Sequence, residues 1–264
     1  ELDQVSDEGL LEALECCRRS GDTLHENKGL ALCIHAGGSR GMVYLRTARP
    51  LTEFERRLAE VLSVSIATGL ENVALFQRLN FFAYFDPLSQ LPNRANFVSR
   101  IDERLREGGS GWTVAVLDID HFSDINAALG HRTGDLLLQA VARRMRAGFP
   151  PEVVLARVSG DTYGLLGADA QIDPEQILSL FAQPLVVEGQ SLIIQPYLGL
   201  EKLAEAEGTG SDIFKNAHIA LARAKNEQRE HWQYFTREMQ VATQQRLGLL
   251  NDLRHAAEDK RGLS

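Results

Sequence analysis

The chain has 264 residues, of which 44% are apolar and 24% are charged, proportions that suit a folded protein with a sizeable core. Its 28 basic and 36 acidic residues give a net charge of −8, which argues against a protein that binds nucleic acid through a basic face. The three cysteines, Cys16, Cys17 and Cys33, have no CxxC spacing, so we expect no disulfide framework, no thiolate zinc site and a cytoplasmic location.

Membrane insertion and export are the next classes to consider. No apolar run approaches the roughly 18 residues that a membrane span needs, so we expect no membrane contact. The chain starts with Glu1-Leu2-Asp3, which is neither a signal peptide nor an initiator methionine. We therefore expect it to be a segment of a longer protein.

The first elements along the chain are a short helix and a hairpin. Residues 6–19 fit a helix, with Ser6 as its N-cap. Two apolar runs follow, residues 29–36 and 41–47, and the Gly-Gly-Ser-Arg segment between them has the composition of a turn. This arrangement predicts a pair of antiparallel strands.

A long helical pattern runs from Thr52 to about Tyr84, on the order of 50 Å at 1.5 Å per residue. Its apolar positions recur every three or four residues, at Leu58, Leu62, Ile66, Val73, Phe76 and Leu79. The pattern fits either a helix that closes a domain or a parallel coiled coil that connects a sensor to an output domain. The length favours the second interpretation.

Asp86-Pro87 ends that helix, because proline disfavours the helical conformation of the residue before it. Beyond it, four helical segments are predicted, at residues 95–106, 122–146 with an interruption at 130–134, 174–181 and 211–228. Six strands alternate with them, at residues 112–117, 153–158, 162–167, 185–187, 192–200 and 231–235, and a polar helix follows over 236–258. This order predicts an α/β or α+β layered domain around one mixed sheet.

Three segments of this second part could carry chemistry. Asp118 ends a buried strand, and Asp161 lies at a hairpin tip. Lys225 and Arg229 lie one helical turn apart and face the same way. Each has a simpler interpretation, as a helix cap, a turn residue or solvated surface charges. Together they could hold a magnesium triphosphate, because Mg²⁺ prefers one or two carboxylates together with phosphate oxygens.

With these three segments in their order, residues 81–236 resemble a GGDEF domain, the output module of diguanylate cyclases, and four motifs carry the resemblance. Residues 86–94 are similar to its opening motif, D-x-L-T-x-L-P-N-R, and residues 118–135 to D-I-D-x-F-K-x-I-N-D-x-x-G-H-x-x-G-D. Residues 157–163 occupy the place of R-x-G-G-D-E-F, and residues 217–225 resemble A-D-x-A-L-Y-x-A-K.

The resemblance implies a βαββαβ core like that of polymerase palms and nucleotidyl cyclases. It also implies a metal site, in which Asp118, the carbonyl of Ile119 and Asp161 would hold Mg²⁺. Asp161 would in addition be the remaining acidic residue of the catalytic signature.

For the nucleotide, the resemblance implies GTP as the ligand. Asn126 and Asp135 would bind the guanine edge by hydrogen bonds, and Lys225 and Arg229 would contact the phosphates.

Several positions depart from the family pattern. Thr162 replaces the signature's Glu and can neither bind Mg²⁺ as an anion nor accept a proton from the attacking hydroxyl, a role that contributes ~10²–10⁴-fold in rate. Ser123 replaces the phosphate-binding lysine and Ser159 the first glycine, while His218 and Ala222 replace the usual Asp and Tyr. Pro150 and Val153 stand where the feedback-inhibition motif R-x-x-D would lie, so product inhibition there is not expected.

The flanking segments resemble parts of a signalling protein. Residues 29–82 are similar to the end of a GAF-like sensor domain, and residues 237–258 to the helix that joins GGDEF to EAL phosphodiesterase domains. The expected organisation is a partial sensor segment, a signalling helix, a degenerate GGDEF domain and a linker toward a C-terminal EAL-like domain, over residues 1–51, 52–85, 86–236 and 237–264.

We therefore expect a homodimeric regulatory module of bacterial cyclic di-GMP signalling. It would bind GTP, lack useful cyclase activity and control a C-terminal EAL-like partner. An active cyclase that makes cyclic di-GMP from two GTP, and a spacer without a ligand, are the two alternatives.

Overall fold

The computed structural model describes residues 24–26, 29–36, 39–46, 49–227, 230–242 and 245. The chain divides into two compact units, Glu1–Phe81 and Phe82–Ser264, which are described separately. The predicted helix at residues 6–19 lies outside the described residues.

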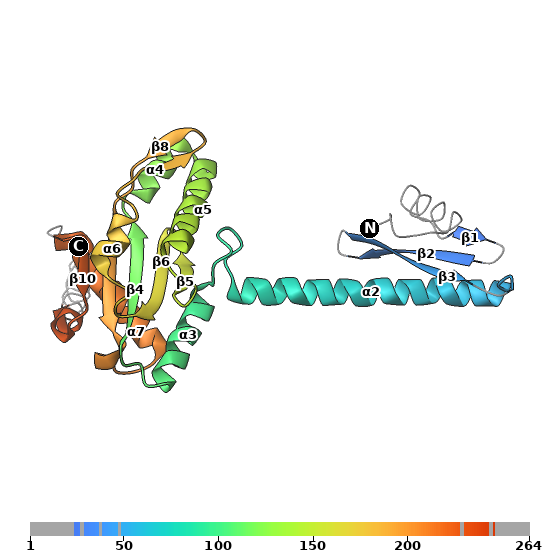
Figure 1. Ribbon diagram of the computed structural model, residues 1–264, viewed down its shortest axis with the longest axis horizontal. Helices are drawn as coiled ribbons and strands as arrows, with labels where there is room; N and C mark the ends of the chain where they lie inside the picture. The colour runs from blue at the N-terminus through green and yellow to red at the C-terminus, as the bar shows by residue number, and fades with distance from the viewer. Residues whose placement is uncertain are drawn as a thin grey trace, which may run out of the picture. The chain divides into compact units, whose positions relative to one another are not determined.

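The first unit contains a three-stranded antiparallel sheet in the order β1-β2-β3 (Figure 1). The strands are β1 (Leu24–Glu26), β2 (Gly29–Ala36) and β3 (Ser39–Arg46). Strands β2 and β3 pair from Gly29↔Arg46 to Ala36↔Ser39, so the predicted hairpin is confirmed.

The helix α2 (Glu53–Tyr84) follows this sheet and has 32 residues, as the apolar periodicity predicted. Its start is capped reciprocally, because Thr52 N donates to Glu55 Oε2 at 2.8 Å and Glu55 N donates to Thr52 Oγ1 at 3.3 Å. Only Ala59 and Ser63 are buried along it within the described part of the chain.

By length and composition, α2 is also the one helix among the described residues that could cross a membrane. The expectation that no stretch approaches such a length missed it, because Glu60 and Glu71 interrupt the apolar run while its average hydropathy stays high. Most of the apolar residues of α2 are exposed, which also suits a helix that pairs with another helix.

The second unit is built on a five-stranded sheet in the order β10-β9-β4-β6-β5. Its strands are β4 (Trp112–Ile119), β5 (Val154–Ser159), β6 (Thr162–Ala168), β9 (Pro196–Lys202) and β10 (Trp232–Tyr234). All neighbours are antiparallel except β9 and β10, which are parallel. The predicted mixed sheet and layered α/β fold are confirmed.

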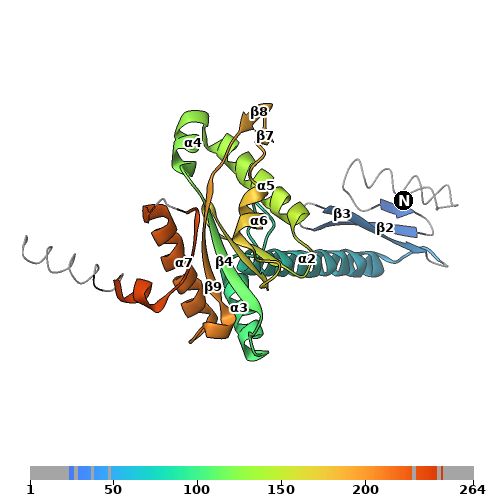
Figure 2. The same ribbon diagram turned by 60° about the vertical axis from the view of Figure 1, so that its left-hand side comes forward.

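Helices cover both faces of this sheet, and Figure 2 shows α5 and α7 on opposite sides. The helices are α3 (Arg94–Arg106), α4 (Phe122–Leu129), α5 (His131–Gly148), α6 (Pro174–Ser179) and α7 (Gly210–Glu227). Along β4, Val114 and Val116 join the core under α3 and α7, whereas Leu117 and Ile119 join the core under α5. Both faces of β4 are therefore buried, which explains its continuous apolar run.

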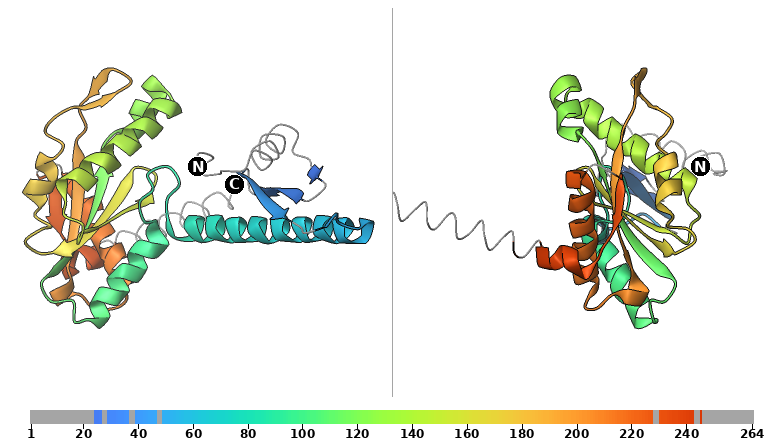
Figure 3. Two further views of the ribbon diagram at one scale, coloured as in Figure 1. Left: turned by 45° about the vertical axis from the view of Figure 1, so that its right-hand side comes forward. Right: turned by 90° about the vertical axis from the view of Figure 1, so that its left-hand side faces the viewer.

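Two predicted elements are divided in the structure. The helical pattern over 122–146 is interrupted at Gly130, within the predicted interruption at 130–134, and a glycine adopts its φ of 85° without strain. The strand predicted over 192–200 is split between β8 (Gln190–Leu192) and β9. Strand β8 pairs with β7 (Leu185–Val187) in a separate two-stranded sheet, which lies beside the start of α5 (Figures 1 and 3).

Candidate functional site

Asp118, near the end of β4, is the centre of the candidate site. Its side chain is only 14% exposed and forms an ion pair with Lys225 of α7. Its second oxygen accepts a hydrogen bond from Thr162 Oγ1 at 3.2 Å, because Thr162 is the register partner of Asp118 on β6. Thr162 is itself buried, so both oxygens of Asp118 are held by the protein.

Asp161 lies beside this centre, at the tip of the β5–β6 hairpin. Burial raises the pKa of its carboxyl, the Asp118 charge raises it further, and Lys225 and Arg157 oppose the rise. Two carboxylates thus share one partly buried space. The structure brings together Asp118, Asp161 and Lys225, which lie far apart in the sequence.

This donor set fits the magnesium ion of a nucleotide. The two carboxylates and the Ile119 carbonyl would offer oxygen ligands, and a cation would oppose the burial and the Asp118 charge that raise the pKa of Asp161. No group of three or more His, Cys, Asp or Glu side chains forms a metal site within the described part of the chain. Phosphate oxygens would therefore have to complete the coordination.

The two residues expected to bind guanine come from neighbouring helices. Asn126 belongs to α4, and its Oδ1 is buried without a hydrogen-bond partner among the described residues. A Cβ added to Gly134 of α5 would lie 1.9 Å from this oxygen, so only glycine leaves room for Asn126 here. Asp135, next to Gly134, is exposed. A purine edge would reach Asn126 Oδ1 only if this side chain turned away from Gly134, whereas the Asp135 side chain is already exposed.

The other predicted positions are less constrained. Ser123 and Ser159 are exposed, and Arg229 lies outside the described residues. His218 packs edge-on against Phe214 at 4.5 Å between ring centroids. Burial lowers the pKa of His218, and nearby Arg94 lowers it further, so this side chain favours the neutral form.

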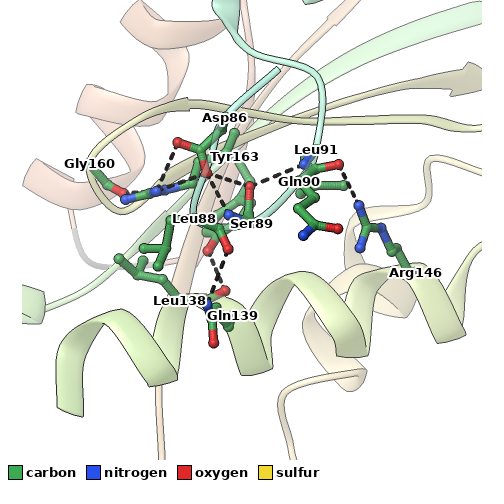
Figure 4. Close-up of polar contacts among 11 residues, drawn as sticks. Asp86, Leu88, Ser89, Gln90, Leu91, Leu138, Gln139, Arg146, Gly160 and Tyr163 are labelled. Carbon is green, nitrogen blue, oxygen red and sulfur yellow. Dashed lines mark hydrogen bonds and ion pairs between the residues drawn. The ribbon is translucent and has the colours of Figure 1, made fainter. Parts of the chain in front are cut away.

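A network of hydrogen bonds ties the loop after α2 to the signature hairpin (Figure 4). Arg157 Nη1 lies 3.0 Å from both carboxylate oxygens of Asp86, and Arg157 Nε donates to the Gly160 carbonyl at 2.8 Å. Asp86 also accepts from Ser89 N at 2.7 Å and from Ser89 Oγ at 2.6 Å. Burial alone would raise the pKa of Asp86, but these donors outweigh it and lower the pKa.

Asp86 and Arg157 both lie in motifs of the family resemblance, but neither residue was predicted to belong to the site. Their opposite charges and their places in two recurring motifs were the available signal. The network borders a pocket of about 310 Å³, which is lined by Asn93, Arg94 and Gly160 among others. The loop that leaves α2 is thereby fixed to the hairpin that carries Asp161.

Comparison with known families divides the chain at nearly the same place as its two units. Residues 83–231 match the family described as "Diguanylate cyclase, GGDEF domain". Residues 1–79 match "Domain of unknown function (DUF3369)". The predicted likeness of residues 29–82 to a GAF-like sensor is not part of these matches and stays a prediction.

Several curated relatives come from Pseudomonas aeruginosa. The cyclic di-GMP phosphodiesterase NbdA is 31% identical over 213 residues, which cover 78% of this chain and 27% of NbdA. The bifunctional diguanylate cyclase/cyclic di-GMP phosphodiesterase MucR is 32% identical over 206 residues, covering 75% and 29%. The diguanylate cyclase TpbB is 28% identical over 218 residues, covering 79% and 46%. The chain thus spans less than half the length of each.

Solved structures agree with the fold. The GGDEF domain of TpbB (YfiN) from Pseudomonas aeruginosa is 27% identical with a TM-score of 0.56, and the match covers 61% of this chain and 99% of that one. The diguanylate cyclase SiaD, solved with its activator SiaC from the same species, is 27% identical with a TM-score of 0.50, and the match covers 65% and 69%.

Proposed function

Because this chain belongs to the GGDEF family and carries the GGDEF domain of cyclic di-GMP signalling, we propose that it is a regulatory module that binds GTP without cyclising it at a useful rate. The observation that carries the proposal is the hydrogen bond from Thr162 to Asp118. At the place of the signature's Glu, the chain has a hydroxyl group that serves the neighbouring carboxylate rather than a metal or a substrate.

Loss of chemistry is supported at two positions. Thr162 supplies neither a negative charge for Mg²⁺ nor a proton acceptor, and a missing general base costs ~10²–10⁴-fold in rate. Ser123 supplies no positive charge for phosphate. When bound with the nucleotide, Mg²⁺ would neutralise phosphate charge next to Asp118, Asp161 and the Ile119 carbonyl.

Retention of a guanine site is supported by Asn126 and Asp135. The buried Oδ1 of Asn126 lacks a donor in the described part of the chain, which is costly unless a ligand supplies one. Lys225 pairs with Asp118 in the free protein and would turn from it to a phosphate. Arg229 would add a second phosphate contact.

The alternative is an active diguanylate cyclase that converts two GTP into cyclic di-GMP and pyrophosphate across a homodimer. Asp118 and Asp161 favour it, since both carboxylates of the metal site are retained. TpbB bears that activity in its name. Detection of the product distinguishes the two functions.

We propose that the module acts within a longer cytoplasmic protein. A homodimer through α2 would bring two modules together, and a C-terminal EAL-like domain would receive the signal. NbdA and MucR, which are named as phosphodiesterase and bifunctional enzyme, support this arrangement. The acidic net charge agrees with a role that involves no nucleic acid.

The test is a calorimetric titration with GTP and with ATP in the presence of Mg²⁺. We expect GTP to bind at micromolar concentration or weaker, and ATP to bind roughly 5- to 150-fold more weakly, because adenine leaves Asn126 and Asp135 unpaired. Asp135→Ala should remove the preference, whereas Asp124→Ala on the exposed face of α4 is the matched control.

The same samples are incubated with GTP and Mg²⁺ and separated by chromatography. Turnover of about 1 s⁻¹ or more would establish the cyclase function instead. Equal affinity for both nucleotides would contradict the guanine site, and binding of neither nucleotide would favour a spacer without a ligand.

A further inference from the structure

A second pocket lies away from the nucleotide site, on the α7 side of the sheet. It has a volume of about 960 Å³, within the range of small-molecule sites. It is lined by residues of strand β9, the short 3-10 helix η2 (Leu203–Glu205), α7 and the segment 234–241. Neither the motifs of the family resemblance nor the proposed function accounts for it.

Glu201 is the unusual residue of this pocket. It lies on β9 between Leu200 and Lys202, and its side chain is on the same face of the strand as Tyr197, toward α7. Only 6% of Glu201 is exposed. Asn216 of α7 donates to its Oε1 at 3.1 Å, while no described group donates to its Oε2, which is also buried.

A buried carboxyl with one oxygen unpartnered is costly for the folded state. Burial raises the pKa of Glu201 to about 7, Asp212 adds to the rise, and the hydrogen bond from Asn216 opposes it. Near neutral pH the group thus gains or loses a proton readily, and a cation that reached it would favour the carboxylate.

Of the three cations that line the pocket, Lys215 lowers the pKa of Asp212, and Lys202 and Arg237 have the following partners. Lys202 Nζ lies 5.6 Å from the centre of the Tyr234 ring, and Arg237 pairs with Glu207 at 2.5 Å. Acidic residues are more numerous than basic ones along the walls. The pocket thus combines a buried carboxyl oxygen that no described group donates to with walls in which acidic residues outnumber basic ones, and this combination favours a cationic ligand.

We propose that this pocket binds a small organic cation, whose ammonium or guanidinium group donates to Glu201. The site is independent of the nucleotide site, since its residues come from β9, η2, α7 and the segment after β10. The probe for the test is agmatine, which carries a guanidinium group at one end and an ammonium group at the other.

The experiment is calorimetry and thermal unfolding of the whole chain with agmatine at constant ionic strength. We expect a dissociation constant of about 1 mM or tighter. Glu201→Gln keeps the shape of the side chain and should weaken binding by about tenfold or more. Glu175→Gln, which removes an exposed carboxylate of α6 outside the pocket, is the control and should change binding by less than about threefold.

A second measurement needs no variant. At about pH 6.5 a fraction of Glu201 is protonated, so agmatine binding should release protons, seen as a binding heat that depends on the buffer. No binding at about 10 mM agmatine, or equal binding by Glu201→Gln, would overturn the proposal. GTP titration of the same samples is separate, because loss of the nucleotide site leaves agmatine binding intact.

Discussion

Asp86 and Arg157 are 71 residues apart in the sequence, yet one guanidinium nitrogen lies 3.0 Å from both carboxylate oxygens. The pair joins the loop after α2 to the hairpin that carries Asp161. The loop is fixed further because Asn93 N donates to the Tyr84 carbonyl at 2.9 Å, and Arg157 N donates to the Pro92 carbonyl at 2.9 Å. A movement at the end of α2 would therefore reach the signature hairpin through short, polar contacts.

The first prediction concerns the strength of this connection. Asp86→Asn should destabilise the folded protein by about 3 kcal/mol, because it leaves the Arg157 charge, only 12% exposed, without its partner. A double-mutant cycle with Arg157→Gln in urea unfolding measures the coupling. Glu103→Gln, which removes an exposed ion pair with Arg100, is the control and should cost less than about 1 kcal/mol.

This connection also has a pH signature. The pKa of Asp86 is lower in the folded state than in the unfolded state, so its contribution is present above about pH 4 and is lost as the pH falls through the lowered pKa. Wild type should therefore lose stability in that acid range more steeply than Asp86→Asn. Parallel acid unfolding curves would contradict the assignment.

The second prediction tests whether Thr162 is what weakens the metal site. Thr162→Glu adds a third carboxylate beside Asp118 and Asp161, so the variant should melt at a lower temperature without metal. Millimolar Mg²⁺ should then raise its melting temperature more than that of wild type. Thr162→Gln has the same size without the charge, and an equal response from both variants would contradict this explanation.

Much of the second unit could be predicted from the sequence, because burial on both faces of β4 gives a run without alternation. The hairpin tip with Asp161 was predicted as well, since a Ser-Gly-Asp segment between two short apolar runs is a turn signal, and Gly160 does have a positive φ. The break before β9 could not be predicted. Ile193 is 74% exposed although it is apolar, and an apolar run does not reveal which strand its residues pair with.

The candidate site was predicted only in its composition. The ion pair of Lys225 with Asp118 joins residues separated by 107 positions, and local patterns carry no such information. Glu201 gave no signal at all, since one acidic residue at the end of an apolar strand usually faces water. Its burial depends on α7 and on the segment after β10, which only the fold brings together.

The third prediction is that α2 pairs with α2 of a second copy. Its exposed apolar residues would otherwise face water along the helix, and Leu62 and Val73 are 52% and 56% exposed. Light scattering should give about twice the 29.3 kDa chain mass. Leu62→Lys should shift the protein toward the monomer. Glu71→Lys, about 180° around the helix from Leu62 at 3.6 residues per turn, should leave the dimer intact.

The fourth prediction concerns the space around Asn126. Gly134→Ala would force Asn126 Oδ1 out of its buried position, because the new Cβ would lie 1.9 Å from it. The amide can move, and alanine favours a helix by up to about 1 kcal/mol over glycine, so thermal stability should change little. The preference for GTP over ATP should nevertheless fall. Unchanged selectivity would mean that Asn126 does not contact the base.

The last prediction follows from Glu201. Its pKa is about 7 in the folded protein because of burial, against 4.5 for an ordinary glutamate. The folded state therefore keeps the proton that the unfolded state loses, so stability falls as the pH rises between these two values and is constant above them. At 1.4 kcal/mol per pH unit, the loss of stability amounts to roughly 3 kcal/mol.

Glu201→Gln does not ionise and should be more stable than wild type at about pH 8, and nearly equal to it at about pH 5. Urea unfolding at both pH values measures the difference, with exposed Glu205→Gln as the control, which should follow wild type at each pH. A Glu201→Gln variant that is less stable than wild type at the higher pH would show that the ionised carboxylate already has a cationic partner in the free protein.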